Sequence, residues 1–146
     1  MDECRRHRLV ADVALVSRGS VLLVRYRDVS RYDGQRGWFL PDDFLQHLEH
    51  PADAARRIAR DQAGLDDAQA DLRFIESFGD GAWHLVFHFM AEVAEPVVVQ
   101  PHGNIAAAQW FPVDALPPAD QLAHDGWAAD VLEQELSAGR ASDAGH

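Results

Sequence analysis

The sequence contains no lysine, a single cysteine and no long apolar run. All thirteen of its basic residues are arginine, which excludes a lysine nucleophile or Schiff base anywhere in the chain. Cys4 has no second cysteine with which to form an internal disulfide. No stretch approaches the roughly 18 apolar residues that cross a membrane, and the N-terminal residues lack the apolar segment of a secretion signal. We therefore expect a cytoplasmic protein without a membrane partner.

Positive charge is also scarce, because 24 acidic residues give the chain a formal net charge of -11. Binding to an extended nucleic acid depends on basic residues that neutralise phosphates, so no nucleic-acid partner is expected. A small anionic ligand remains compatible with this charge. The composition leaves the oligomeric state open, a homo-oligomer included.

The length and composition are those of one compact domain. A chain of 146 residues, 47% of them hydrophobic, is long enough to bury a core. We place the core of this single domain at about residues 9–137. The last residues, 138–146, are small and polar, and we expect them to form a flexible tail.

The N-terminal part of the chain predicts strands. Val10–Val16 and Val21–Tyr26 are apolar, β-branched runs, and the turn residues between them indicate a β-hairpin. Arg27–Arg36 is polar and reads as a loop. It leads into Trp38–Pro41, a short apolar stretch that we expect to be a short strand.

The clearest helix signal lies between Pro51 and Ala63. These residues are good helix formers with proline at the start, and Gly64 follows the end, where glycine favours the left-handed helix cap. Beyond it, Leu72–Phe78 and Trp83–Val93 predict two strands joined by a glycine-containing turn.

The C-terminal third predicts one more strand and one more helix. Ala106–Val113 is the strand candidate, and Val97–Gln100 is a candidate extension of the sheet. From Asp120 to Ser137 apolar residues recur near helical spacing, although Gly126 weakens the middle of that helix. Together these elements predict an α/β fold in which a mixed sheet is flanked by at least two helices.

A loop and the first helix carry a characteristic spacing. Asp43, Glu49 and Arg57 are followed by Gly64 at the intervals of a known signature: glycine, five residues, glutamate, seven residues, then Arg-Glu-apolar-x-Glu-Glu-x-Gly-apolar. With the apolar stretch Trp38–Pro41 before it, this pattern resembles the Nudix hydrolases. The resemblance spans about residues 9–136, and it implies an α/β/α sandwich around a mixed sheet.

The resemblance also implies a metal site, which this chain has largely lost. In the family, glutamates three and four apart on the helix bind Mg²⁺ or Mn²⁺, which clamps a diphosphate and helps to generate a water nucleophile. The corresponding helix face carries Ile58, Asp61 and Gln62, so one of three carboxylates survives. The family motif is therefore degenerate here, and standard metal-dependent hydrolysis is expected to be lost or weak.

Positions outside the helix agree with this loss. Asp42-Asp43 replaces the family's Gly-Gly and adds bulk and negative charge where phosphate would approach. Asn104 and Ala107 match positions where many members place further glutamates. Glu49 and Arg57, in contrast, match the family's ion pair between loop and helix, a structural role that outlives catalysis.

The remaining metal candidates are Asp61 and Glu49. The loop histidines His47 and His50 flank Glu49 and are well placed to add ligands. His84 and His88 lie on one face of a predicted strand, but about 13 Å apart, which is too far to share an ion.

Arginine and aromatic side chains near the predicted cleft are the candidates for holding an anionic or nucleotide-like ligand. Those selected are Arg25, Arg27, Arg36, Trp38 and Trp83, with Phe78 and Phe87 as further aromatic candidates.

Two functions remain open. The first is a non-hydrolytic Nudix-fold module that binds a nucleotide-like or other small ligand, or a protein partner, in the old cleft. The second is a Mg²⁺- or Mn²⁺-dependent pyrophosphohydrolase whose unorthodox metal site uses Asp61, Glu49 and Asp43, with Asp42 or a histidine. The sequence favours the first.

Overall fold

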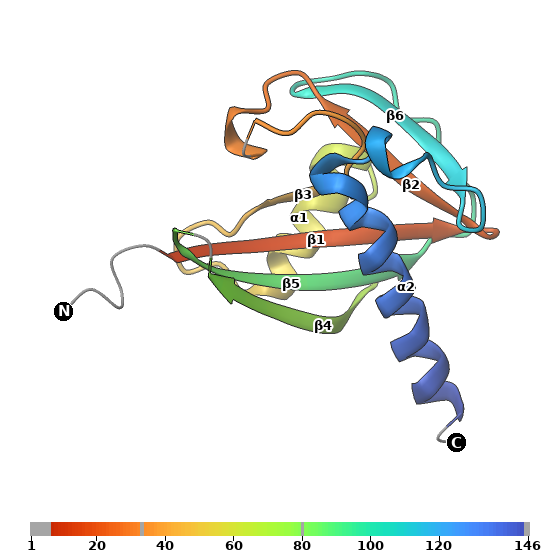
Figure 1. The fold of residues 1–146 in the computed structure, drawn as a ribbon. Helices are drawn as coiled ribbons and strands as arrows, with labels where there is room; N and C mark the ends of the chain where they lie inside the picture. The colour runs from red at the N-terminus through yellow and green to blue at the C-terminus, as the bar shows by residue number, and fades with distance from the viewer. Residues whose placement is uncertain (1–6, 33, 80, 145–146) are drawn as a thin grey trace.

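A computed structural model of the chain describes residues 7–32, 34–79 and 81–144, with side chains described as far as residue 137. Its elements follow in the order β1 His7–Ser17, β2 Ser20–Tyr26, the 3-10 helix η1 Ser30–Tyr32, β3 Asp42–Phe44, α1 Pro51–Ala63, β4 Ala70–Gly79, β5 Trp83–Glu92, β6 Ile105–Pro112, the 3-10 helix η2 Ala119–Gln121 and α2 Ala123–Ala144 (Figure 1). Within the described part of the chain, none of the helices is both long and apolar enough to cross a membrane.

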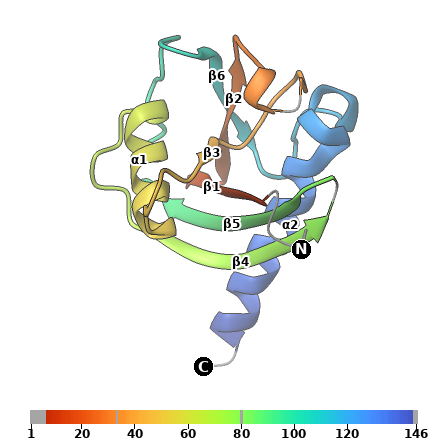
Figure 2. The same ribbon diagram turned by 90° about the vertical axis from the view of Figure 1, so that its left-hand side faces the viewer.

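The strands form one mixed sheet in the order β4-β5-β1-β2-β6, with β3 paired to β1. The central strand β1 runs parallel to β5 over ten residue pairs, while the other pairings are antiparallel. Helix α1 covers one face of the sheet and α2 the other (Figure 2). The predicted α/β/α arrangement around a mixed sheet is confirmed.

The sheet forks next to β1. Strands β1 and β2 form the predicted hairpin, but they pair only next to their turn, at Val16–Val21 and Ser17–Ser20. Beyond that point β2 diverges, and residues 38–44 lie between the two strands. Phe39 pairs with Val24 of β2, and β3 pairs with the N-terminal half of β1. The fork matters because it leaves room beside the sheet for the cavity described below.

Helix α1 has the bounds that the sequence predicts. His50 caps its start by accepting a hydrogen bond from the Ala52 amide at 3.0 Å, and Pro51 occupies the first turn. Gly64 ends it at φ 72°, in the left-handed region that glycine adopts without strain. Its buried face is largely alanine, which lets the helix axis lie close to the sheet.

Helix α2 is interrupted near its start. His124, Asp125 and Gly126 all have positive φ, so regular helix begins only at Trp127. The sequence predicts one continuous helix weakened at Gly126, and the structure turns that weakness into a kink. A Cβ added at Gly126 would lie 3.2 Å from the Ala119 Cβ. The α2 helix includes residues as far as Ala144, and the flexibility expected of the tail stays a prediction.

Two expected strands are wrong. Trp38–Pro41 makes only isolated bridges, from Phe39 to Val24 and from Trp38 to Leu122, and the strand begins at the next residue. Val97–Gln100 is not a strand either. It lies between two prolines, which lack the amide donor of a sheet ladder, and the Val97 carbonyl instead accepts a hydrogen bond from the Trp110 indole at 2.8 Å.

Candidate functional site

The loop before α1 is attached to the helix through Arg57. Its guanidinium contacts both Glu49 carboxylate oxygens, at 2.9 and 3.0 Å, which is the bidentate pair expected from the sequence. It also donates to Asp43 Oδ2 at 2.9 Å and to the Phe44 carbonyl at 3.0 Å. The hydrogen bonds from Arg57 hold the pKa of Glu49 below its usual value. Asp43 and Glu49 are thereby bound to an arginine rather than left open to a cation.

Replacing Arg57 with alanine should lower the free energy of unfolding by about 1 to 3 kcal/mol, because Glu49 would lose its arginine partner and Asp43 one of its two. The Arg57 side chain is only 12% exposed. Urea unfolding measures the change. The matched control is Arg56→Ala, since Arg56 is a neighbouring arginine that is 60% exposed and pairs with Asp53. Equal unfolding curves for the two variants would contradict the structural role of Arg57.

The helix face that corresponds to the family's metal site has no converging carboxylates. Ile58 is 1% exposed and packs in the hydrophobic core, so it contributes no polar group to this face. Asp61 is half exposed, and its carboxylate lies 3.1 Å from the Arg60 Nε. Gln62 is the one of the three that reaches toward the loop, where it contacts Asp42 and Tyr26.

Gln62 closes a ring of hydrogen bonds with Asp42 and Tyr26. Its Nε2 donates to the Asp42 carbonyl at 2.9 Å, and its Oε1 accepts from the Tyr26 hydroxyl at 2.8 Å. The Tyr26 hydroxyl in turn accepts from the Asp42 amide at 3.0 Å. Burial raises the pKa of Tyr26, so the phenol stays neutral. The aromatic rings of Tyr32 and Tyr26 stack with their centroids 4.0 Å apart. Aromatic carbon therefore lies beside the hydrogen bonds of Gln62, Tyr26 and Asp42.

The residues around Asp42 do not fit the divalent cation that the resemblance implies. Mg²⁺ and Mn²⁺ require several oxygen acceptors, most of them charged. Here an amide N–H is directed at the Asp42 carbonyl, and no three metal-ligating side chains gather anywhere among the described residues. Of the loop histidines, His50 uses its Nδ1 to cap α1 and His47 is exposed.

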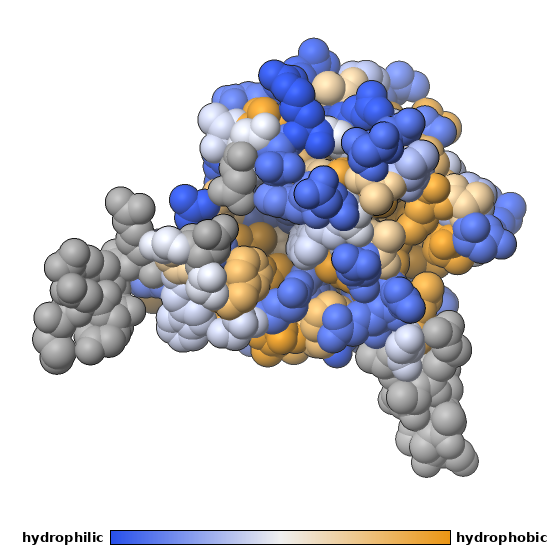
Figure 3. All heavy atoms as spheres, viewed as in Figure 1, coloured by the Kyte–Doolittle hydropathy of each residue, from blue (hydrophilic) through white to orange (hydrophobic). Residues whose placement is uncertain are grey.

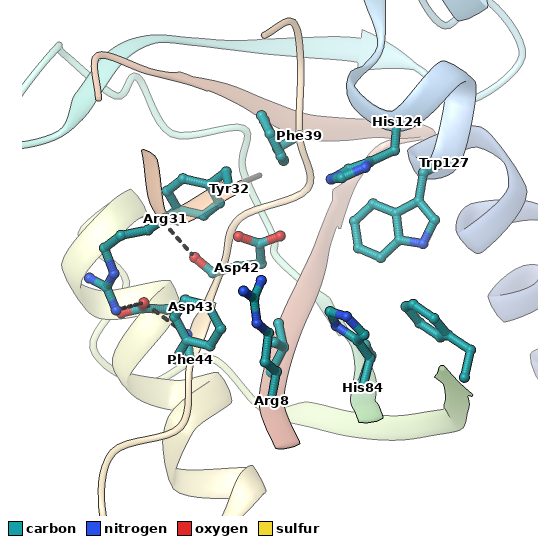
Figure 4. Close-up of a pocket in the computed structure, with 13 residues that line it drawn as sticks. Arg8, Arg31, Tyr32, Phe39, Asp42, Asp43, Phe44, His84, His124 and Trp127 are labelled. Atoms are coloured by element: carbon teal, nitrogen blue, oxygen red, sulfur yellow. Dashed lines mark hydrogen bonds and ion pairs between the residues drawn. The ribbon is translucent and has the colours of Figure 1, made fainter. Parts of the chain in front are cut away.

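A cavity of about 300 Å³ opens beside this ring, on the α2 side of the sheet. Side chains of the segment 38–44 lie across it from the start of α2 (Figure 4). The lining residues are Arg8, Val10, Arg31, Tyr32, Phe39, Asp42, Asp43, Phe44, Phe78, His84, Val86, His124 and Trp127. On the same side of the molecule, hydrophobic side chains are exposed between hydrophilic ones (Figure 3).

The cavity combines aromatic walls with charged groups. His84 stacks on Phe78 with ring centroids 4.7 Å apart and nearly parallel planes, and Trp127 contributes an indole from α2. Arg31 pairs with Asp43 at 2.9 Å on the opposite side of the cavity. Such a cavity suits a planar ring that stacks on aromatic carbon and carries an anionic substituent.

The five ligand candidates chosen from the sequence do not line this cavity. Trp38 is buried in the core with the Arg25 guanidinium 4.4 Å above its ring, and Arg27 and Arg36 are exposed elsewhere. Trp83 is half exposed and donates to the Ser77 hydroxyl. Their role in binding stays a prediction, and apart from the contact between Arg25 and Trp38 the structure does not bring them together.

Sequence reasoning proposed Phe78 but missed most of the other cavity residues. One signal was available for His84, because the predicted hairpin between β4 and β5 places it opposite Phe78. Arg8 and Trp127 had no such signal. Their meeting depends on the parallel pairing of β1 with β5 and on the kink that starts α2, neither of which leaves a local pattern.

The chain matches one family model, described as the NUDIX domain, over residues 6–133. Similar solved structures include a MutT NUDIX hydrolase from Burkholderia pseudomallei, at 26% identity and TM-score 0.70, covering 88% of this chain and 98% of that one. A Nudix hydrolase from M. Smegmatis, also at 26% identity and TM-score 0.70, covers 92% and 87%. A C. elegans Ap4A hydrolase shares the fold at 15% identity and TM-score 0.66, covering 97% and 99%. No curated protein matches the chain.

Proposed function

Because the chain belongs to the Nudix family, we propose that it is a member that binds a small anionic, nucleotide-like ligand without hydrolysing it. The observation that carries the proposal is the closed hydrogen-bond ring of Gln62, Tyr26 and Asp42. It occupies the helix face on which the family's chemistry depends with neutral groups that are already bonded to one another.

The ring opposes a catalytic cation for two reasons. A cation at the Asp42 carbonyl would have to displace the Gln62 amide, and the displaced side chain would offer one neutral oxygen in place of a carboxylate. The carboxylates of Asp43 and Glu49 are held by Arg57, and separating them from it would leave a largely buried guanidinium without these partners. A metal-activated water therefore has no support among these side chains.

The cavity supports the binding half of the proposal. Its volume of about 300 Å³ is at the lower end for small-molecule sites, which suits a ligand no larger than a mononucleotide. Aromatic walls favour a planar base or similar ring, and Arg31 at the rim favours a phosphate or carboxylate.

Binding should be measured by isothermal titration calorimetry with nucleoside monophosphates, nucleoside diphosphates and nucleotide sugars, in EDTA. We expect at least one of these ligands to bind, and Arg31→Ala to weaken its binding about tenfold through loss of a charge-assisted contact of roughly 1.4 kcal/mol. The control Arg36→Ala, an exposed arginine that does not line the cavity, should bind like the natural protein.

Two results would contradict this function. The first is the absence of binding by every ligand tested in EDTA. The second is binding that requires Mg²⁺ or Mn²⁺ and survives Arg31→Ala, since the cation would then make the contact that the proposal assigns to the arginine.

A further inference from the structure

Five ionisable side chains, three of them buried, lie between α2 and the sheet, away from the family's motif. They are Asp12 of β1, Arg73 and Glu76 of β4, His88 of β5 and Glu135 of α2, and together they are called the α2 cluster below. The side chains of Asp12, His88 and Glu135 are fully buried. Buried charges are costly unless they are paired, so the protonation of this cluster bears directly on how α2 is held.

His88 lies between two carboxylates. Its Nδ1 is 2.7 Å from Asp12 Oδ2, an ion-pair separation outside good hydrogen-bond geometry, and its Nε2 is 2.6 Å from Glu76 Oε1. Since each ring nitrogen faces a carboxylate oxygen, a proton on both nitrogens is favoured. Burial by itself would lower the pKa of His88, but the contacts with Asp12 and Glu76 raise it above the usual value.

Glu135 has no comparable partner. Neither of its carboxylate oxygens has a hydrogen-bond partner within the described part of the chain, and the same is true of Asp12 Oδ1 and Arg73 Nε. The charges that act on Glu135 are those of Asp12 and Arg73. Burial, reinforced by the charge on Asp12, raises the pKa of Glu135 to about 9. The carboxyl group is therefore neutral at physiological pH.

The charges of the cluster balance when Glu135 keeps its proton. His88 and Arg73 then offset Asp12 and Glu76, whereas ionised Glu135 would add an unpaired negative charge beside Asp12. The other acidic side chains nearby are exposed: Asp71 on β4, opposite Met90, and Glu133 on α2.

The α2 cluster also touches the wall of the cavity. The His88 ring stacks on the Phe74 ring with centroids 4.3 Å apart. The centroid of the Trp127 ring lies 5.7 Å from that of His88, and Trp127 also lines the cavity. Trp127 begins the regular part of α2, and Glu135 follows about two turns later on the same helix. The helix thus rests on the cluster both at its first turn and at Glu135.

We propose that the α2 cluster is a proton-dependent latch, which holds α2 on the sheet while Glu135 is protonated and loosens the helix, with the Trp127 wall of the cavity, when that proton is lost. The latch depends on no ligand, so it stands or falls separately from the proposed function. Its direction follows from the buried carboxyl group, because opening the helix to water lets Glu135 ionise without cost and rising pH favours the open state.

Hydrogen–deuterium exchange of the full chain tests the latch. After correction for intrinsic exchange, the protection of residues 127–137 should fall by at least about tenfold between about pH 6 and pH 8. Because a single proton is involved, the fall should not exceed about tenfold per pH unit. Helix α1 on the opposite face serves as the internal reference, and at each pH it should be more strongly protected than residues 127–137, because α2 opens without the rest of the fold. Glu135→Gln, which cannot ionise, should remove the pH dependence, while Glu133→Gln on the exposed face of α2 should retain it.

Three results would overturn the latch. Protection of residues 127–137 that does not change with pH in the natural protein is the first, and it requires no variant. The second is a full pH dependence in Glu135→Gln. The third is equal protection of α1 and α2 at every pH, which would mean that α2 opens only when the whole fold opens.

Discussion

Hydrolysis of nucleoside diphosphate derivatives by this chain is expected to run at least about a thousandfold below a normal Nudix rate, a loss of more than about 4 kcal/mol of transition-state stabilisation. Weak cation attachment removes both the phosphate clamp and the activated water, so the losses compound. Phosphate release should be followed with Mg²⁺ and with Mn²⁺ over dinucleotides, nucleotide sugars and nucleoside triphosphates.

The decisive variants follow from the structure. Robust turnover by the natural protein that disappears in Asp61→Ala would establish an unorthodox metal enzyme in place of a binding module. The double variant Asp61→Glu, Gln62→Glu restores carboxylates at positions that contact solvent or the loop. Ile58→Glu is left out because Ile58 is 1% exposed, and a carboxylate there would be buried in the core. Metal binding by the double variant, together with none by the natural protein, would support the view that this fold no longer carries the family's metal chemistry.

Replacing Glu135 with glutamine is expected to raise the free energy of unfolding by about 4 kcal/mol near pH 7.5. The folded-state pKa of Glu135, about 9, lies above the ordinary value of 4.5, so the folded protein binds the extra proton between these limits. Its stability therefore falls as pH rises through this window. Glutamine stays neutral in both states and removes that cost. Urea unfolding of the natural protein and the variant from about pH 5 to pH 9 measures the difference.

The pH profile is the more telling readout. Near pH 5 the two proteins should have nearly equal stability, and the gap should widen with pH, while Glu133→Gln should follow the natural protein throughout. A constant gap at every pH would mean that glutamine merely packs better than glutamate. A lower stability of Glu135→Gln at about pH 8 would contradict a buried, protonated carboxyl group.

Local signals in the sequence predict local structure well. Pro51 and Gly64 bound α1 because proline fits the first helical turn and glycine fits the left-handed cap, and both preferences act within a few residues. The resemblance to the Nudix motif likewise predicts the ion pair of Glu49 and Arg57, which the structure contains.

Features that depend on distant segments could not be predicted in the same way. His84 and His88 share one strand face, as expected, yet one lines the cavity and the other is buried between carboxylates. What separates their surroundings is the register of β1 on β5, which places Asp12 opposite His88 and Arg8 opposite His84. The two paired strands are far apart in the sequence, and the alternation of apolar and polar residues in each strand does not reveal its partner or register.

The hydrogen bonds of Gln62 with Asp42 and Tyr26 also limit which substitutions position 62 tolerates. Glutamate at that position would set a second acceptor against the Asp42 carbonyl, which now receives an amide proton, and the Tyr26 hydroxyl alone could not satisfy both. Replacing Gln62 with the glutamate of the family motif is therefore expected to weaken the fold. The contacts of Asp42 and Tyr26 thus favour glutamine over glutamate at position 62, independently of any ligand.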